Sequence, residues 1–302
     1  MNLLLTGAWA GAKENIEKLE GMGHKVKFLQ MEKHELPVAY DWVEGVICNG
    51  IFLTHKIENF KNLKYIQLTS AGFDRVPMGY VKDKNIEIHN ARGVYSIPMA
   101  EFALAGVLSL YKKLSFFKDN QDNRVWEKNR NLTELFGKKV CIIGCGSVGN
   151  ECAKRFDAFG CDVIGVNRTI KDNELYKKNY SIDDIDEALK ISDIVVLTLP
   201  LTDETHHLMN KERLSRMKKG SIFVNIARGA IVDTNALIEC LNDNIGGAVL
   251  DVFEEEPLNE SSPLWNMENV ILTPHNSFVS DRNIDRLNEV VLKNIENKEV
   301  KA

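Results

Sequence analysis

Arg228, Glu256 and His275 are three side chains of this sequence that together could hold a carboxylate and move a proton. Each stands at or just after the end of a short apolar run. If these runs are parallel strands of one sheet, their carboxyl ends lie along the same edge, where ligands of open α/β sheets bind. One such residue at a strand end is usually a capping or solvated side chain, but three at one edge indicate a binding site.

The chemistry of these side chains fits a small carboxylic acid. The planar guanidinium of Arg228 presents two parallel N–H donors to a carboxylate. A carboxylate beside an imidazole favours the imidazolium form, which suits a proton donor at neutral pH. We therefore predict that Arg228 binds a substrate carboxylate and that His275, paired with Glu256, transfers a proton.

A glycine-rich segment points to a second ligand. The apolar run 140–143 is followed at once by the pattern G-x-G-x-x-G, whose glycines are Gly144, Gly146 and Gly149. In a dinucleotide-binding turn the first glycine permits the tight turn and the second lets the backbone approach a pyrophosphate. The third lets helix and strand pack closely. The pattern predicts a nucleotide loop, although by itself it also occurs in ordinary turns.

The residues around this pattern strengthen the prediction. Ser147 and Val148 open an amphipathic segment whose first N–H groups would face the phosphates, and Gly160 stands where such a helix would stop. A second apolar run, 162–166, follows. Strand, turn, helix and strand therefore come in the order that a dinucleotide site requires.

Two series of strand-like runs predict an α/β protein with two Rossmann-like domains. The first series consists of the runs 2–5, 25–29, 45–48, 65–68 and 86–89. The second consists of the runs 140–143, 162–166, 193–197, 221–225, 248–251 and 270–273. Most runs of the second series are near-continuously apolar, which is typical of parallel strands covered on both faces. We expect a doubly wound parallel-sheet cofactor domain and a smaller, flavodoxin-like substrate domain.

Two helical segments set the expected domain boundaries. The apolar-rich segment 96–113 lies between the two series, and the last segment, 281–295, follows the final strand and has no place in the second sheet. We expect the last helix to return to the first domain. The substrate domain then comprises residues 1–92 and 276–302, and the dinucleotide-binding domain comprises residues 93–275.

The composition argues against several classes of partner. The chain has 302 residues, a formal net charge of −5 and a pI near 5.9, so it offers no basic surface for nucleic acid. No apolar run approaches the length that crosses a membrane, and the N-terminus lacks the basic region of a signal peptide. The six cysteines have no paired ligand spacing and are interpreted as buried free thiols in a reducing cytoplasm.

The other histidines do not predict a metal site. His206 and His207 are adjacent, so their side chains would point in different directions on any regular element. No cysteine or carboxylate stands at ligand spacing from them. The histidines interpreted as surface or internally satisfied residues are His24, His34, His55 and His89.

The sequence resembles the D-isomer-specific 2-hydroxyacid dehydrogenase family. The matching segments are NARGVYSIPMAEFALAGVLSL, LFGKKVCIIGCGSVGN, VVLTLPLTDETHHLMN, MKKGSIFVNIARGAIVDTNAL, VLDVFEEEPL and LTPHNS. They cover most of the chain from Leu63 onward, and the last three together are highly specific. By this resemblance Arg228 holds the substrate carboxylate and assists the carbonyl. Glu256 is the acid that pairs with the histidine, and His275 is the general acid/base.

The resemblance also implies cofactor and substrate contacts. The positions that match those lining the cofactor are Pro200, Thr205, Ile226, Ala227 and Asp251. The positions that match the loop whose backbone N–H groups bind the substrate carboxylate are Ser70, Ala71 and Gly72. Asp251 also suits a simple turn cap, and we favour the cofactor contact slightly.

The sequence departs from the family pattern where an acidic residue usually binds the ribose 2′-hydroxyl of NAD. Asn167, Arg168 and Thr169 stand there instead, about twenty residues past the glycines. Asn167 can hydrogen-bond without repelling a 2′-phosphate, and Arg168 adds a cation. We therefore expect NADP(H) to be preferred, with NAD(H) also possible. Lys171 could add a second charge or be a solvated residue.

These features predict an NAD(P)-dependent enzyme that reduces a small 2-keto acid, such as glyoxylate or hydroxypyruvate, to the D-2-hydroxy acid. Glu256 replaces the glutamine of related formate dehydrogenases, which argues against formate, and no added regulatory domain is expected. The alternative is a nicotinamide-sensing binding protein like the family's corepressors. The presence of all three catalytic residues, Arg228, Glu256 and His275, favours the enzyme over the binding protein. We expect a homodimer to which the apolar helix 96–113 contributes.

Overall fold

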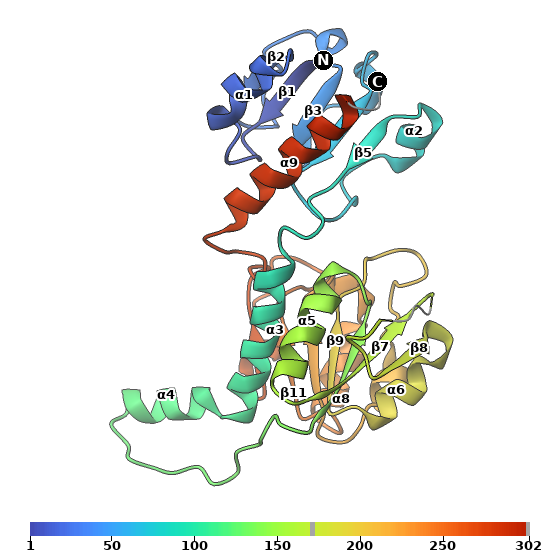
Figure 1. Ribbon diagram of the computed structural model, residues 1–302. Helices are drawn as coiled ribbons and strands as arrows, with labels where there is room; N and C mark the ends of the chain where they lie inside the picture. The colour runs from blue at the N-terminus through green and yellow to red at the C-terminus, as the bar shows by residue number, and fades with distance from the viewer. Residues whose placement is uncertain (170–172, 300–302) are drawn as a thin grey trace. The chain divides into compact units, whose positions relative to one another are not determined.

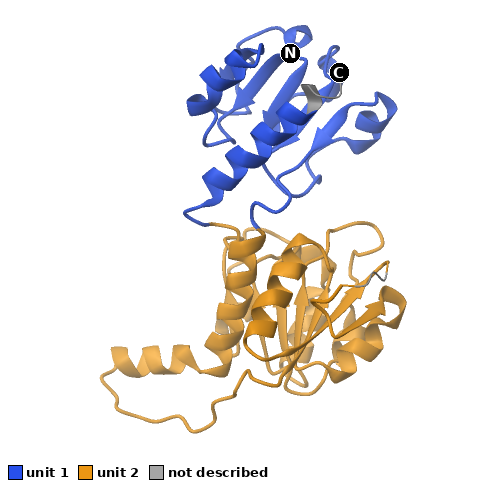
Figure 2. Cartoon of the chain, in the orientation of Figure 1, with its two compact units in different colours: residues 1–95, 280–302 blue, residues 96–279 orange. Residues whose placement is uncertain are grey.

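The computed structural model describes residues 1–169 and 173–299, and the chain divides into two compact units (Figure 2). Unit 1 comprises residues 1–95 and 280–302, and unit 2 comprises residues 96–279. The boundaries expected from the sequence, after residues 92 and 275, lie a few residues before these.

Unit 1 is a five-stranded parallel sheet flanked by helices (Figure 1). Its strand order, β2-β1-β3-β4-β5, is that of flavodoxin-like folds, as predicted. The elements are β1 (Asn2–Thr6), α1 (Ile16–Gly21), β2 (Lys25–Leu29), β3 (Gly45–Cys48), β4 (Tyr65–Leu68), α2 (Met78–Asp83), β5 (Glu87–His89) and α9 (Asn283–Glu299).

Different segments cover the two faces of this sheet, because successive side chains of a strand point to opposite faces. Leu4 of β1 packs in a buried cluster with Val81 of α2. Leu3 and Leu5, on the other face, pack in a cluster with Leu287 of α9. The C-terminal helix therefore covers the first sheet, although the chain reaches it only after completing the second (Figure 1).

Unit 2 is a seven-stranded parallel sheet in the order β12-β11-β10-β9-β6-β7-β8. The order reverses between β6 and β9, which is the crevice where doubly wound folds bind dinucleotides. Its strands are β6 (Lys139–Ile143), β7 (Asp162–Asn167), β8 (Lys178–Ser181), β9 (Ile194–Leu197), β10 (Ile222–Asn225), β11 (Gly247–Leu250) and β12 (Val270–Leu272). Its helices are α3 (Ser96–Tyr111), α4 (Leu114–Asp122), α5 (Ser147–Ala158), α6 (Ile185–Ile191), α7 (Lys211–Ser215) and α8 (Thr234–Leu241).

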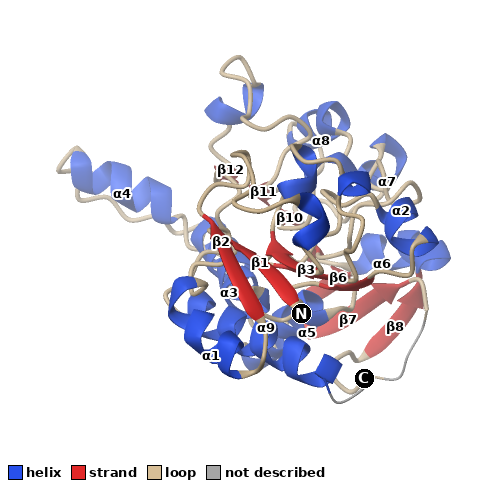
Figure 3. Ribbon diagram, turned by 90° about the horizontal axis from the view of Figure 1, so that it is seen from above, coloured by secondary structure: helices blue, strands red, loops and turns tan. Residues whose placement is uncertain are grey.

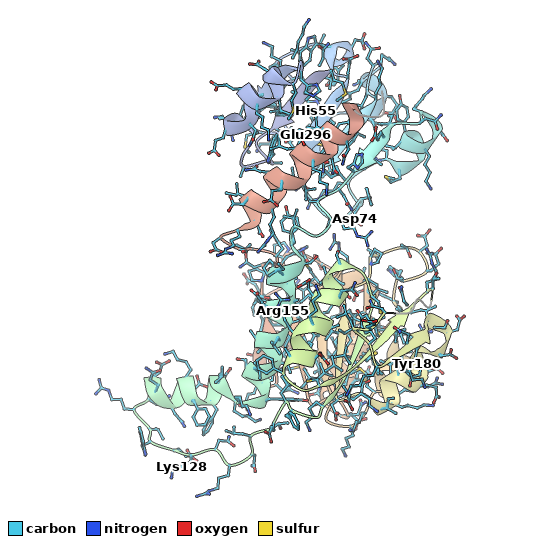
Figure 4. The ribbon with its side chains drawn as sticks, in the orientation of Figure 1. His55, Asp74, Lys128, Arg155, Tyr180 and Glu296 are labelled. Atoms are coloured by element: carbon cyan, nitrogen blue, oxygen red, sulfur yellow. The ribbon has the colours of Figure 1, made fainter. Side chains whose placement is uncertain are left out.

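The edge strand β8 is an element that the sequence pattern does not predict. Its residues include no apolar run, because an edge strand keeps much of its surface in solvent. It pairs with β7, and the ammonium of Lys178 lies 4.3 Å from the ring centroid of Tyr180, which Figure 4 labels at this edge. The second sheet therefore has seven strands, one more than the six expected from the sequence.

Helices cover both faces of the second sheet (Figure 1). One buried cluster packs α3 and α5 on one face, and another packs α6, α7 and α8 on the opposite face. The absence of a side chain at Gly106 lets α3 approach the sheet, since a Cβ there would lie 2.6 Å from Cγ1 of Val249. The apolar side chains of α3 are therefore largely used within unit 2.

Residues 113–132 form an arm that stands apart from the body of unit 2 (Figures 1 and 3). Its base is closed by hydrogen bonds from the Thr133 amide to the Tyr111 carbonyl, 3.0 Å, and from Lys112 Nζ to the Thr133 carbonyl, 2.9 Å. Helix α4 has no buried residue, and Lys128 lies on the outer, non-helical part of the arm (Figure 4). The exposed large apolar side chains of the arm are Leu114, Val125, Trp126 and Leu132.

The described helices include none that is long and apolar enough to cross a membrane. All six cysteines are free and five are buried, as predicted. Cys145, in the glycine loop, is partly buried, and this burial raises the pKa of its thiol. A raised pKa opposes formation of the reactive thiolate at this position.

Candidate active site

The ends of β10, β11 and β12 are joined directly by backbone hydrogen bonds. The Asp251 amide donates to the Asn225 carbonyl at 3.0 Å, and the His275 amide donates to the Asp251 carbonyl at 2.8 Å. These bonds continue the sheet pairing just past the three strands. The segments that carry Arg228, Glu256 and His275 therefore begin side by side at the carboxyl end of the sheet.

Asp251 holds the turn that carries His275. Its side chain is fully buried and accepts three hydrogen bonds, from Thr273 Oγ1 at 2.7 Å, the Asn276 amide at 2.7 Å and the Ser277 amide at 3.0 Å. Both carboxylate oxygens are engaged in these bonds. Asp251 caps this turn, which is one of the two roles that the sequence allows. Its contact with the cofactor stays a prediction.

His275 and Glu256 form a hydrogen-bonded pair. Nδ1 of His275 lies 2.9 Å from Oε2 of Glu256, whose other oxygen accepts from the Phe253 amide at 3.1 Å. The His275 backbone has φ +52°, a left-handed conformation that is uncommon outside glycine and is held here by the bonds to Asp251. Nε2 of His275 has no hydrogen-bond partner among the described residues. That nitrogen can face a substrate.

Arg228 stands on a rigid turn after β10. Asn225 Nδ2 donates to the Arg228 carbonyl at 3.0 Å, and Asn225 Oδ1 accepts from the Ala227 amide at 3.0 Å. The guanidinium donates from Nη1 to the Ala227 carbonyl at 2.7 Å and is half-buried. At Gly229 an added Cβ would fall 1.8 Å from the Phe253 carbonyl carbon. Only glycine permits this close approach, which brings the Arg228 turn against the segment leading to Glu256.

The glycine loop has the conformation that a dinucleotide site requires. Gly144 has φ +103°, and an added Cβ at Gly149 would lie 2.2 Å from the Gly144 carbonyl oxygen. A Cβ at Gly146 would meet no protein atom within 4 Å. Helix α5 begins at Ser147 without a side-chain cap, so the amides of its first turn, including that of Val148, are free to bind phosphate. These residues fit a dinucleotide pyrophosphate.

Other predicted cofactor positions surround this loop. Thr198, just past β9, donates from Oγ1 to the Gly144 carbonyl at 2.6 Å. The chain then turns at Pro200, whose carbonyl accepts from Thr205 Oγ1 at 2.8 Å. Ile226 and Ala227 follow β10 and are buried in the core of unit 2, so only their backbones can line a ligand.

The residues expected to select the nucleotide lie at the end of β7. Asn167 is the last residue of this strand, and its Nδ2 donates to the Thr169 carbonyl at 3.3 Å. Arg168 is exposed. A hydrogen bond from Thr202 and, more weakly, the charge of Arg168 lower the pKa of Glu204, so the guanidinium lies within electrostatic reach of that carboxylate. Lys171 lies outside the described residues.

The predicted substrate loop, residues 70–72, belongs to unit 1 and follows β4. The Ser70 carbonyl accepts from the Ala91 amide at 2.9 Å, and the Ala71 carbonyl accepts from Asn90 Nδ2 at 2.6 Å. Ser70 Oγ donates to the Gly72 carbonyl at 3.2 Å. The amides of Ala71 and Gly72 donate no hydrogen bond to another described residue, so they are available to a carboxylate.

A second histidine–carboxylate pair was not predicted from the sequence. Nε2 of His207 lies 2.6 Å from Oε1 of Glu254, whose other oxygen accepts from the Thr234 amide at 2.9 Å. The rings of His206 and His207 stack with centroids 4.2 Å apart. The expectation that these rings point in different directions is wrong, because they lie in a turn where His207 has φ +48°. The pair ties the 200–207 loop to the segment before Glu256.

Comparison with known proteins identifies the family. A family model described as D-isomer specific 2-hydroxyacid dehydrogenase, NAD binding domain, matches residues 104–277. A glyoxylate reductase of Thermofilum pendens is 36% identical over 241 residues, which are 78% of this chain and 71% of that protein.

Two solved structures are similar along most of their length. A D-lactate dehydrogenase from Aquifex aeolicus, complexed with NAD and lactic acid, has 28% identity and a TM-score of 0.81, with 98% of this chain and 94% of that chain covered. A D-isomer specific 2-hydroxyacid dehydrogenase from Xanthobacter autotrophicus Py2, in complex with NADPH and MES, has 29% identity and a TM-score of 0.81, with 99% and 95% covered. The chain therefore belongs to the D-isomer specific 2-hydroxyacid dehydrogenase family and is an NAD(P)-dependent dehydrogenase.

Proposed function

We propose that the enzyme reduces a small 2-keto acid, such as glyoxylate or hydroxypyruvate, to its D-2-hydroxy acid. The observation that carries the proposal is the His275–Glu256 pair, with 2.9 Å between Nδ1 and Oε2. Nε2 accepts or donates no hydrogen bond among residues 1–169 and 173–299, and the pair lies at the same carboxyl end of the sheet as Arg228. A proton donor, its carboxylate partner and a carboxylate-binding guanidinium are what reduction of a 2-keto acid needs from the protein.

Each residue has a defined task in this reaction. A bound nicotinamide would supply the hydride for the carbonyl carbon. His275 donates the proton from Nε2 to the carbonyl oxygen, which becomes the hydroxyl group, and Glu256 stabilises the imidazolium and fixes the ring through Nδ1. Arg228 and the amides of residues 70–72 hold the substrate carboxylate, so the keto group is oriented before the proton moves.

The activity test mixes the full chain with NADPH or NADH and a panel of 2-oxoacids and follows the absorbance of the reduced nicotinamide. We expect turnover with at least one small 2-oxoacid. Tight binding of the nucleotide without turnover of any member would contradict the proposal and favour a nicotinamide-sensing protein instead. The expected product configuration, D, is checked by chiral chromatography.

We further propose that NADP(H) is preferred over NAD(H). The strand end where an acid would bind the ribose carries Asn167, and the exposed Arg168 follows it. A charge-assisted hydrogen bond contributes about 1.5–3 kcal/mol. Arg168→Ala should therefore weaken NADPH binding about ten- to a hundredfold and leave NADH nearly unchanged.

Comparison of kcat/KM for the two nucleotides tests this preference. Arg216→Lys and Arg216→Ala serve as controls, because Arg216 is a surface arginine of unit 2 bound to Glu212. A wild-type kcat/KM for NADH equal to or above that for NADPH would refute the preference.

We also propose a homodimer and place its main contact on the arm, residues 113–132. Helix α4 buries none of its residues, and Trp126 is 99% exposed. The arm encloses a hollow of about 730 Å³, whose lining includes Phe117, Val125 and Trp126. The large apolar side chains that the arm exposes are stabilised when a second copy covers them, and isologous contacts close as dimers.

Sedimentation equilibrium should give twice the 34.2 kDa chain mass at micromolar concentration. Trp126→Ser should shift the protein toward monomer, because it removes the most exposed large apolar side chain of the arm. Trp265→Ser, at an exposed tryptophan outside the arm, should leave the mass unchanged. A wild-type mass of one chain would contradict the dimer.

A further inference from the structure

Unit 1 contains a cavity that the proposed reaction does not use. It has a volume of about 370 Å³ and is lined by residues from the end of β5 and from helix α9. Its polar lining residues are His89, Asn90, Arg92, Lys293 and Asn294. Phe73, Ile88 and Val290 complete the wall. The volume lies at the lower end of the range of small-molecule pockets and leaves room for a small anion with its bound water.

The charges of this cavity favour an anion. Arg92 and Lys293 line it, and neither forms an ion pair with a described carboxylate. The lining among the described residues includes no acidic side chain, and the nearby Glu87 is bound to His89 at 2.8 Å. Arg92 and Lys293 are exposed at this site, and two cations on one concave surface suit two carboxylates or one phosphate.

The wall of the cavity is held in place by buried polar contacts. Asn294 Nδ2 donates to Oε1 of Gln67 at 2.9 Å, and Gln67, which is fully buried, donates from Nε2 to the Leu68 carbonyl at 2.9 Å. These bonds join α9 to β4 behind the cavity. The backbone that carries Lys293 is therefore anchored next to the cavity.

The cavity also touches the predicted substrate loop. Asn90, a lining residue, donates from Nδ2 to the Ala71 carbonyl at 2.6 Å, and its Oδ1 accepts from the Arg92 amide at 3.2 Å. The next residue, Ala91, donates its amide to the Ser70 carbonyl at 2.9 Å. Any ligand that fixes Arg92 and Asn90 would thus also fix the loop at residues 70–71.

We propose that this cavity binds a small dianion, a dicarboxylate or inorganic phosphate, between Arg92 and Lys293. Its occupancy stabilises the 70–72 loop through Asn90 and so raises the affinity for the substrate carboxylate. The coupling rests on the proposed function of that loop, whereas the anion site itself does not. By linkage, a substrate analogue must raise the affinity for the anion by the same factor.

The test measures binding rather than turnover. The full chain is first saturated with NADPH, which occupies the glycine loop. Malonate, and separately phosphate, is then titrated into it by isothermal calorimetry. Each titration is repeated with oxamate, an unreactive 2-oxoacid analogue that occupies the substrate site. The variants are Lys293→Glu and the matched control Lys61→Glu, which reverses one charge of unit 1 outside the cavity. Thermal melting confirms that both variants fold.

We expect malonate or phosphate to bind the wild type and the Lys61→Glu variant equally, and Lys293→Glu to weaken binding at least about tenfold. Malonate or phosphate should bind about five- to tenfold more tightly when oxamate is present, and by linkage the affinity for oxamate rises by the same factor when the anion is bound. The absence of binding to the wild type, or an equal loss in both variants, would overturn the anion site. Anion binding that is lost in Lys293→Glu but leaves oxamate affinity unchanged, or competes with it, would overturn the coupling.

Discussion

Replacing His275 with alanine is expected to lower kcat for the best 2-oxoacid by about two to four orders of magnitude, the usual contribution of a positioned general acid. Nε2 has no hydrogen-bond partner in the part of the chain that the structure describes, and Nδ1 is bound to Glu256 at 2.9 Å, so one ring nitrogen is held and the other is available to the substrate. Alanine removes the proton donor and leaves the glycine loop intact. Binding of NADPH, measured by fluorescence titration, should therefore be retained.

The His207–Glu254 pair provides a matched control for this experiment. Its two side chains are 39% and 33% exposed, close to the 40% and 38% of His275 and Glu256, and its ring nitrogen lies 2.6 Å from the carboxylate. His207→Ala thus removes a similar hydrogen-bonded histidine from the same unit and should change kcat far less. If His275→Ala turned over within a few-fold of the wild type, His275 would not be the general acid.

The sequence pattern was most informative for elements that are buried on both sides. The runs 45–48 and 65–68 coincide with β3 and β4, two inner strands whose residues are all buried, because a parallel strand between two helical layers is apolar along its length. The same argument explains why β8 was missed. At the edge of the sheet only one neighbour is needed, and the exposed residues carry no periodic signal.

Site residues were predictable where backbone geometry restricts the residue type. The positive φ of Gly144 and the close approach at Gly149 admit glycine almost exclusively, so the loop is visible in the sequence. Asp251 was not predictable in this way. Its three hydrogen bonds reach residues 273–277, more than twenty positions away, and only the pairing of β11 with β12 brings them together.

The dimer contact expected on helix 96–113 stays a prediction, and the structure adds an exposed segment next to it. Gly106 lets that helix settle on the sheet, so many of its apolar side chains pack within unit 2. Further exposed apolar residues follow Lys113, whose φ of +53° precedes helix α4 and the arm. The sequence alone does not show which of these side chains stay exposed, because their exposure depends on what packs against each segment.

Arg228→Lys is the second substitution for which a large effect is expected. Lysine keeps the positive charge but cannot form two parallel hydrogen bonds to a carboxylate, and it cannot reproduce the bond from Nη1 to the Ala227 carbonyl at 2.7 Å that orients the guanidinium. Loss of one charge-assisted hydrogen bond weakens binding about ten- to a hundredfold. Misorientation of the keto group relative to His275 should cost about a further tenfold.

We therefore expect kcat/KM for the best 2-oxoacid to fall about a hundred- to a thousandfold in Arg228→Lys, with KM raised and kcat lowered together. Arg216→Lys makes the same chemical change at a surface ion pair with Glu212 and should leave both constants unchanged. Because Arg228 lies on a turn fixed by Asn225, the fold should tolerate lysine, and thermal melting checks this directly. An unchanged kcat/KM in a folded Arg228→Lys enzyme would remove Arg228 from the carboxylate site.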